Sequence, residues 1–188
     1  MRLALILLTA AAASAQGDWA MLAPAAGVAA PVGGGFGGEW TAAPGVAAHL
    51  EAPAYGGAVR AALWTARYDA LEGATGVLGP VPDFALAVPT VGWGPVLEAG
   101  PVRAGVGVHL GVAVFRFDDG ADDALTTETE VAVGGWAGLT LEVAGPLEAW
   151  AEVSATRVAL DEPDAVWTAS GGLAVRLSTP QWLRRALR

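Results

Sequence analysis

The side chains in this sequence that could do chemistry are two histidines, and carboxylates and arginines spread along the chain. Neither His49 nor His109 has a serine beside it in a pattern that would predict a hydrolase. We therefore expect both histidines to be hydrogen-bonded interior groups and predict no catalytic residue. A lipid-modifying enzyme would also need a hydroxyl or carboxylate beside the histidine and access from a membrane, and it remains an alternative.

Carboxylates crowd together at Asp118–Asp123, whose sequence is DDGADD. Such crowding is typical of calcium sites, but this run lacks the spacing of an EF-hand loop and its final bidentate glutamate. We interpret it as a solvated loop and predict no metal site and no cofactor.

The composition limits the partners and the means of stabilisation. The 188 residues carry a net charge of −9, and all ten basic residues are arginines, which disfavours nucleic acid and other polyanions as partners. There is no cysteine, so stability must come from hydrogen-bonded strands and packing rather than from disulfides.

The chain begins with an export signal and continues as one domain. Arg2, the apolar run Leu3–Leu8 and the small residues Ala13–Ala15 predict a secretory signal peptide over residues 1–15. We expect an irregular, Ala- and Pro-rich lead-in over 16–31, a β-barrel domain over 32–178 and a tail over 179–188.

The clearest strand pattern lies at Val102–Phe117, VRAGVGVHLGVAVFRF. From Val102 to Val114 the even positions are apolar and mostly large, and the odd positions are small or charged, such as Arg103, Gly105 and His109. Arg116 falls on the apolar parity, so we expect a bulge or the end of the regular strand near Val114. A period of two is that of a β-strand, and a bulky face opposite a small or charged face is the reverse of a soluble strand. We interpret the bulky face as facing lipid.

Alternating segments predict eight strands, at 32–41, 46–52, 58–68, 84–98, 102–117, 128–143, 147–160 and 166–178. The connections at Pro53–Gly57, Ala99–Pro101 and Ala144–Pro146 are short, and those at Asp69–Asp83, Asp118–Thr127 and Asp161–Ala165 are longer and more acidic. This alternation of short turns and longer loops is typical of outer-membrane barrels. The sequence therefore predicts an all-β, eight-stranded, antiparallel, up-and-down transmembrane β-barrel.

The runs GVGVHLGVAVFRF, VAVGGWAGLTLEV and SGGLAVRL, with the signal peptide and the rhythm of the turns, resemble the small eight-stranded outer-membrane β-barrels of the OmpA type. The resemblance covers 32–178 and implies a membrane-embedded scaffold, without naming an activity. Such barrels usually end on an aromatic residue that closes the last strand, whereas this chain ends QWLRRALR. Either Leu177 closes the strand and a tail follows, or the barrel assignment is wrong.

Placing the bulky face in lipid turns a set of polar residues inward. We predict that they form a structural ion-pair network, because unpaired charge in so narrow an interior is costly. We expect Arg103 to meet Glu142, and Glu148 to meet Arg176; a proton path or narrow pore is the alternative. The predicted members are Glu51, Arg60, Arg103, His109, Glu142, Glu148, Glu152 and Arg176.

These inferences predict a non-enzymatic, monomeric, integral protein of the outer membrane of a Gram-negative-type bacterium. Its expected partners are outer-membrane lipid and, through the acidic loops, extracellular or envelope proteins. Two alternatives remain: a lipid-modifying barrel enzyme, and an exported soluble barrel whose bulky face points inward around a hydrophobic ligand.

Overall fold

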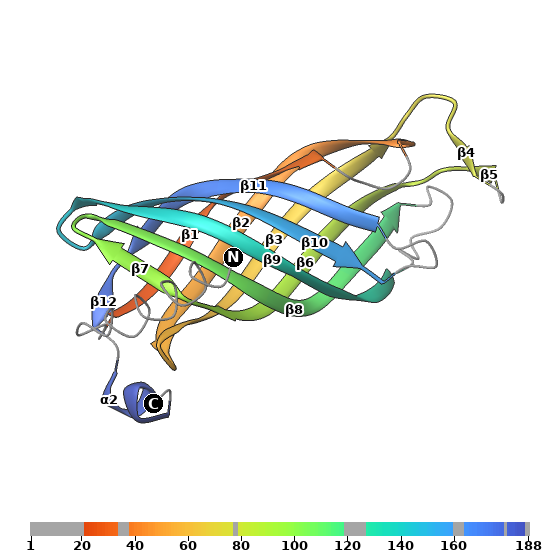
Figure 1. Ribbon diagram of the computed structural model, residues 1–188. Helices are drawn as coiled ribbons and strands as arrows, with labels where there is room; N and C mark the ends of the chain where they lie inside the picture. Colours follow the sequence, from red (N-terminus) through yellow and green to blue (C-terminus); the bar gives the residue numbers. More distant parts are fainter. Residues whose placement is uncertain are drawn as a thin grey trace, which may run out of the picture.

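A computed structural model of the chain describes residues 21–33, 38–76, 79–118, 127–159, 164–178 and 180–186. The expected signal peptide and all of the acidic run except Asp118 lie outside these residues. The described residues form a closed barrel with short turns at one end and longer connections at the other (Figure 1).

Eight antiparallel strand segments make the barrel; we call each of them a wall, because two of the eight consist of two consecutive strands. Each wall pairs with the next one along the chain. Two walls are interrupted: β6 and β7 are halves of one wall separated by Pro95, and β11 and β12 are halves of another separated by Arg176. The walls are β1 (Met21–Gly33), β2 (Trp40–Ala54), β3 (Gly57–Ala70), β6 (Asp83–Gly94) with β7 (Val96–Ala99), β8 (Val102–Asp118), β9 (Thr127–Ala144), β10 (Leu147–Val158), and β11 (Asp164–Val175) with β12 (Leu177–Ser178).

The first and last walls close the barrel. β1 pairs with β11 from Ala25 opposite Ala174 to Gly33 opposite Trp167, and Leu22 pairs with Leu177 of β12. The expected closure of the last strand at Leu177 therefore matches the observed ladder. Closure leaves no open sheet edge, which is the condition for a β-structure to lie in lipid.

Tight turns at one end position the walls. Tyr55 and Gly56 both have positive φ (51° and 74°), the type I′ geometry that matches the twist of a two-residue hairpin. Gly100 and Gly145 supply the positive φ of the other two short turns. Between β3 and β6, a small hairpin, β4 (Thr75–Gly76) with β5 (Gly79–Pro80), projects beyond the opposite end (Figure 1).

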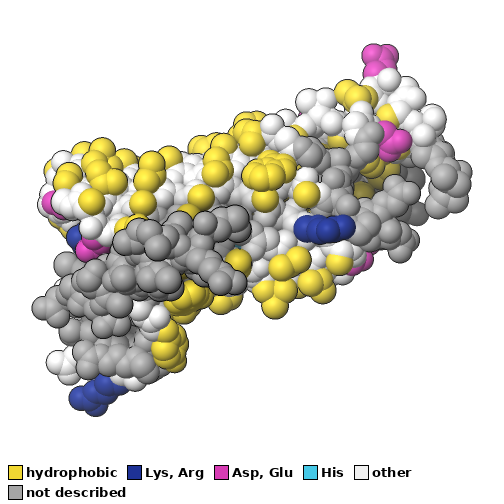
Figure 2. All heavy atoms as spheres, in the orientation of Figure 1, with side chains coloured by type: hydrophobic (Ala, Val, Ile, Leu, Met, Phe, Trp, Pro, Cys, Tyr) yellow, Lys and Arg dark blue, Asp and Glu magenta, His cyan; other side chains and the backbone are white. Residues whose placement is uncertain are grey.

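The bulky face of each wall is on the outside. On β8, Val108 and Leu110 are 67% and 61% exposed, whereas His109 between them is 8% exposed. Apolar side chains are spread along the length of the barrel on the face that Figure 2 shows. This arrangement matches the expected lipid-facing side and is the reverse of a soluble barrel that binds an apolar ligand inside.

The expected irregular lead-in is wrong from Met21 onward, because residues 21–33 form β1. In the segment expected as the first strand, 32–41, residues 32–33 end β1, 38–39 form a turn and 40–41 begin β2, and 34–37 lie outside the described residues. In β1 the inward residues Ala23, Ala25, Gly27 and Ala29 are small, and the outward positions include the equally small Ala26 and the proline Pro24. Because the two faces differ little in size, their alternation was hidden in the sequence.

The turn expected before residue 46 is also wrong, since β2 runs without interruption from Trp40 to Ala54. The Pro44–Gly45 pair marks a β-bulge, where the register with β3 shifts by one residue between Pro44 and Ala47. A Cβ on Gly45 would lie 2.2 Å from the Thr65 carbonyl oxygen, so the bulge requires a glycine.

The chain ends in a short helix, α2 (Gln181–Ala186), which follows β12. None of the helical segments among the described residues is long and apolar enough to cross a membrane.

The outward face of β8 yields a stability prediction. Strands tilted by about 40° advance roughly 2.5 Å per residue along the barrel axis, so Val108 lies about 15 Å and Val112 about 25 Å from the short-turn end. Val108→Arg should destabilise the folded protein in lipid vesicles by about 2–4 kcal/mol and Val112→Arg by about 0–1 kcal/mol. Urea titration followed by tryptophan fluorescence measures both, and equal costs would contradict the lipid-facing assignment.

Candidate functional site in the barrel lumen

Glycines on β8 make room for a tryptophan in the lumen. Trp136 of β9 lies over the inward-facing Gly105 and Gly107, where added Cβ atoms would come within 2.8 and 2.7 Å of the indole ring. Trp136 is 8% exposed, so the ring occupies the lumen rather than the membrane side. The small residues of the β8 pattern thus shape the interior.

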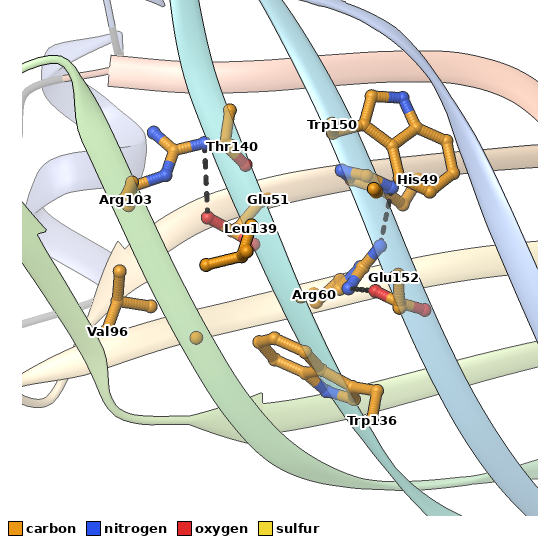
Figure 3. A pocket seen from close by; sticks show the side chains of 13 residues that line it. His49, Glu51, Arg60, Val96, Arg103, Trp136, Leu139, Thr140, Trp150 and Glu152 are labelled. Atoms are coloured by element: carbon orange, nitrogen blue, oxygen red, sulfur yellow. Dashed lines mark hydrogen bonds and ion pairs between the residues drawn. The ribbon is translucent and has the colours of Figure 1, made fainter.

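Arg60 of β3 occupies the middle of the lumen. Its guanidinium lies 4.8 Å from the centroid of the Trp136 ring and forms an ion pair with Glu152 of β10, which is on the opposite wall (Figure 3). Its Nη2 donates to His49 Nδ1 at 2.6 Å. Because arginine only donates, His49 accepts this bond as a neutral imidazole. One buried cation on β3 therefore contacts side chains of three other walls, β2, β9 and β10.

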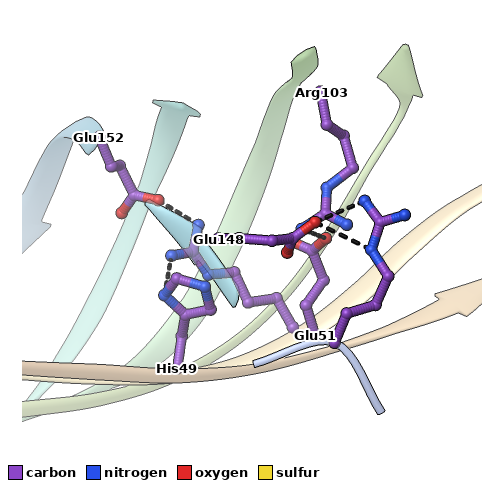
Figure 4. A network of polar contacts seen from close by, with 7 residues as sticks. His49, Glu51, Arg103, Glu148 and Glu152 are labelled. Atoms are coloured by element: carbon purple, nitrogen blue, oxygen red, sulfur yellow. Dashed lines mark hydrogen bonds and ion pairs between the residues drawn. The ribbon is translucent and has the colours of Figure 1, made fainter. Parts of the chain in front are cut away.

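A second cluster lies nearer the short turns (Figure 4). Glu148 of β10 is 1% exposed and accepts from Arg103 Nη2 at 3.2 Å and from Arg176 Nη2 at 2.5 Å. Arg103 also lies 3.7 Å from Glu51. A buried carboxylate held by two guanidiniums is the charge-assisted arrangement that makes interior charge tolerable.

The structure brings most of the predicted network residues together. Glu51, Arg60, Arg103, Glu148, Glu152 and Arg176 take part in the two clusters, and Arg176 lies beside Glu148 as expected. His109 is buried further toward the loops, where its Nε2 lies 3.1 Å from Thr156 Oγ1.

The expected contact between Arg103 and Glu142 is wrong. Glu142 is exposed, because Val102 of β8 pairs with Leu141 and Glu142 lies beyond the end of that strand. Arg103 instead reaches across the lumen to Glu148 and Glu51. The register of β9 with β10 shifts between Leu147 and Glu148, an irregularity that residue spacing did not reveal.

The cavities described in the lumen are small. Two cavities of about 20 Å³ each lie beside Arg60 and Trp136, and each is about the size of one water molecule. Among the described residues, the indole N–H groups of Trp136 and Trp150 have no hydrogen-bond partner in the protein. No group of three or more His, Cys, Asp or Glu residues in the described segments is arranged to hold a metal ion.

Aromatic side chains fill the lumen at the loop end, and sequence reasoning missed this cluster. Tyr68 stacks on Phe84 at 4.7 Å, and Phe84 lies 5.6 Å from Phe115. Trp40 packs edge-on against Phe84 and donates from Nε1 to the Pro82 carbonyl at 2.9 Å. The alternation of the strands could have predicted the cluster, because Phe84 lies on the same inward face as Leu86, and Phe115 on the same inward face as His109.

The two histidines lie apart in the lumen and have different partners. His49 is bound to Arg60 and packs edge-on against Trp150 at 4.7 Å, on the short-turn side of the barrel. His109 precedes the inward-facing Phe115 by six positions on β8, so the aromatic cluster lies between this histidine and the loops.

Comparisons with known proteins identify the fold. No protein-family model and no curated protein matches the sequence. Neisserial surface protein A is 18% identical, with a TM-score of 0.55 over 87% of this chain and 99% of that one. Ail of Yersinia pestis, in complex with the heparin analogue sucrose octasulfate, is 13% identical, with a TM-score of 0.51 over 84% of this chain and 97% of that one.

Both proteins are eight-stranded outer-membrane barrels. The closed antiparallel sheet and these two similarities show that this chain has the fold of the small outer-membrane β-barrels.

The cluster around Glu148 yields the second prediction. Arg103→Met leaves Glu51 and part of Glu148 without their partner, and breaking a buried pair in this way should cost about 3–5 kcal/mol of unfolding free energy. Arg67→Met, which removes the exposed 2.8 Å pair with Asp69, should cost at most about 1 kcal/mol. Urea unfolding measures both.

The double substitution Arg103→Met with Glu51→Gln is the matched control. It removes one charge of each sign, so it should recover part of the loss caused by Arg103→Met alone. Unchanged assembly and heat stability in Arg103→Met would contradict a stabilising network.

Proposed function

We propose that this protein is a monomeric, integral outer-membrane barrel that acts as a non-enzymatic scaffold or surface-interaction protein. The observation that carries the proposal is the reversed polarity of the barrel, with apolar residues outside and a neutralised ion-pair network inside. Such an exterior is stable in lipid and unstable in water. Outer-membrane lipid is therefore its first partner.

The filled lumen favours a scaffold over a channel or an enzyme. Three arginines and three glutamates balance one another in the two clusters, and the aromatic residues around Phe84 block the loop end. A structural network of this kind holds walls at fixed positions, since the pairs Arg60–Glu152 and Arg103–Glu51 join strands that are far apart in the sequence. Interaction with other molecules is then left to the loops.

The charge of the loop end indicates which surface partners suit this chain. Ail was crystallised with a polyanion, the heparin analogue sucrose octasulfate. In this chain Asp69, Asp83, Asp118 and Glu128 lie at the loop end, and the whole protein carries a charge of −9. Repulsion between like charges disfavours the same ligand here, and we propose cationic surfaces of extracellular or envelope proteins instead.

Cell fractionation tests the location directly. The protein should remain with the envelope after high-salt and carbonate washes, leave it with detergent, and migrate faster on gels when unheated than when boiled, because a closed barrel resists SDS until heated. Release from the envelope without detergent, together with the absence of a heat-dependent gel shift, would refute the proposal.

Planar-bilayer recording tests the sealed lumen. The wild-type protein should give no discrete conductance steps above those of a protein-free bilayer, because the Phe84 cluster and the ion pairs fill the lumen. The double variant Phe84→Ala with Phe115→Ala, which removes two rings of the cluster, should leak more than the wild type. Stable single-channel steps in the wild type would favour the pore alternative.

A further inference from the structure

The C-terminal helix α2 concentrates positive charge in a strongly acidic protein. Three of the ten arginines, Arg184, Arg185 and Arg188, lie in the last five residues, whereas the whole chain carries a net charge of −9. Arg185 is exposed, and Trp182 of the same helix is 70% exposed. An exposed tryptophan beside a row of arginines is not accounted for by the barrel.

The helix sequence is amphipathic. At 100° per residue, the positions of Trp182, Leu183 and Ala186 fall within an arc of about 100°, and those of Arg184 and Arg185 fall on the opposite side. A short helix with tryptophan and leucine on one face and arginines on the other is typical of segments that lie on an anionic membrane surface.

The fold holds this helix close to the edge of the apolar belt. β12 ends at Ser178, where it pairs with Met21 at the start of β1, and α2 begins three residues later. Three residues span at most about 10 Å, so the helix stays near the short-turn end of the barrel. Figure 1 shows α2 beside β12 at this end, away from the acidic connections.

We propose that α2 lies on the membrane leaflet at the short-turn end and binds the phosphate headgroups of anionic phospholipids. Trp182 inserts at the headgroup level, and Arg184 and Arg185 attract the negative surface. The proposal rests on the membrane insertion of the barrel proposed above.

A nitroxide label on the full chain tests this docking, because the protein has no cysteine of its own. Ala186→Cys is labelled and the protein is placed in nanodiscs of phosphatidylcholine alone or with one quarter phosphatidylglycerol. In the anionic discs, collisions of the label with oxygen should increase and collisions with a water-soluble nickel chelate should decrease. The same label on Tyr55→Cys in a short turn should show no comparable difference.

Matched charge variants isolate the arginines. Arg184→Gln with Arg185→Gln should lower the docked-to-free ratio roughly 30-fold in anionic discs, since each arginine near such a surface contributes about a fivefold factor. Arg116→Gln with Arg157→Gln removes the same charge from exposed positions on β8 and β10 and should leave the ratio unchanged.

Equal label accessibility in the two disc types for the wild-type helix would overturn the docking proposal. This outcome is separate from failure of the proposed function, because the heat-dependent gel shift of the same labelled protein reports whether the barrel has formed. A retained gel shift with no lipid dependence means that the barrel is correct and that α2 does not bind the leaflet.

Discussion

Closure of the barrel between β1 and β11 is the constraint on which the rest of the structure depends. In an apolar exterior each backbone N–H and C=O must find a partner within the sheet, and an open edge would leave a row of them without one. The ladder from Ala25–Ala174 to Gly33–Trp167 removes that edge. Once the sheet is closed, each side chain of a strand faces either the outside of the barrel or a narrow lumen. The alternation of large and small residues along a strand then separates outward from inward positions.

Limited space in the lumen explains why small and very large residues occur together inside. An eight-stranded barrel has room only for side chains, and Trp136 fits because Gly105 and Gly107 lie beneath it. Gly134 does the same for His109, whose Nε2 would be 2.7 Å from an added Cβ. The glycines that weaken the strands locally therefore give the interior its packing, and their positions are set by side chains on neighbouring walls.

The sequence predicted the class of fold, the outward face and most inward polar residues, because these depend on a period of two that is strong in β8 and β9. It failed at β1, where alanines face both sides, and at Gly45, where a bulge resembled a turn. The sequence predicted side-chain partners across the lumen less well. Glu152 meets Arg60 because their walls are opposite after closure, a relation that no local spacing encodes.

The distribution of charge follows from the same geometry. Inside the barrel a lone charge is costly, so Glu51, Glu148 and Glu152 each face an arginine, and the clusters sum to zero. Excess charge is tolerated only where water is available, which is at the two ends. Among the described residues, acidic side chains such as Asp69, Asp83 and Asp118 lie at the loop end, and the exposed Arg185 of α2 follows the last strand at the short-turn end, so the two surfaces of a membrane-spanning barrel would differ in charge. We therefore expect selective interactions of this protein at these ends, because the outward face of the strands between them is largely apolar and the cavities described in the lumen are small.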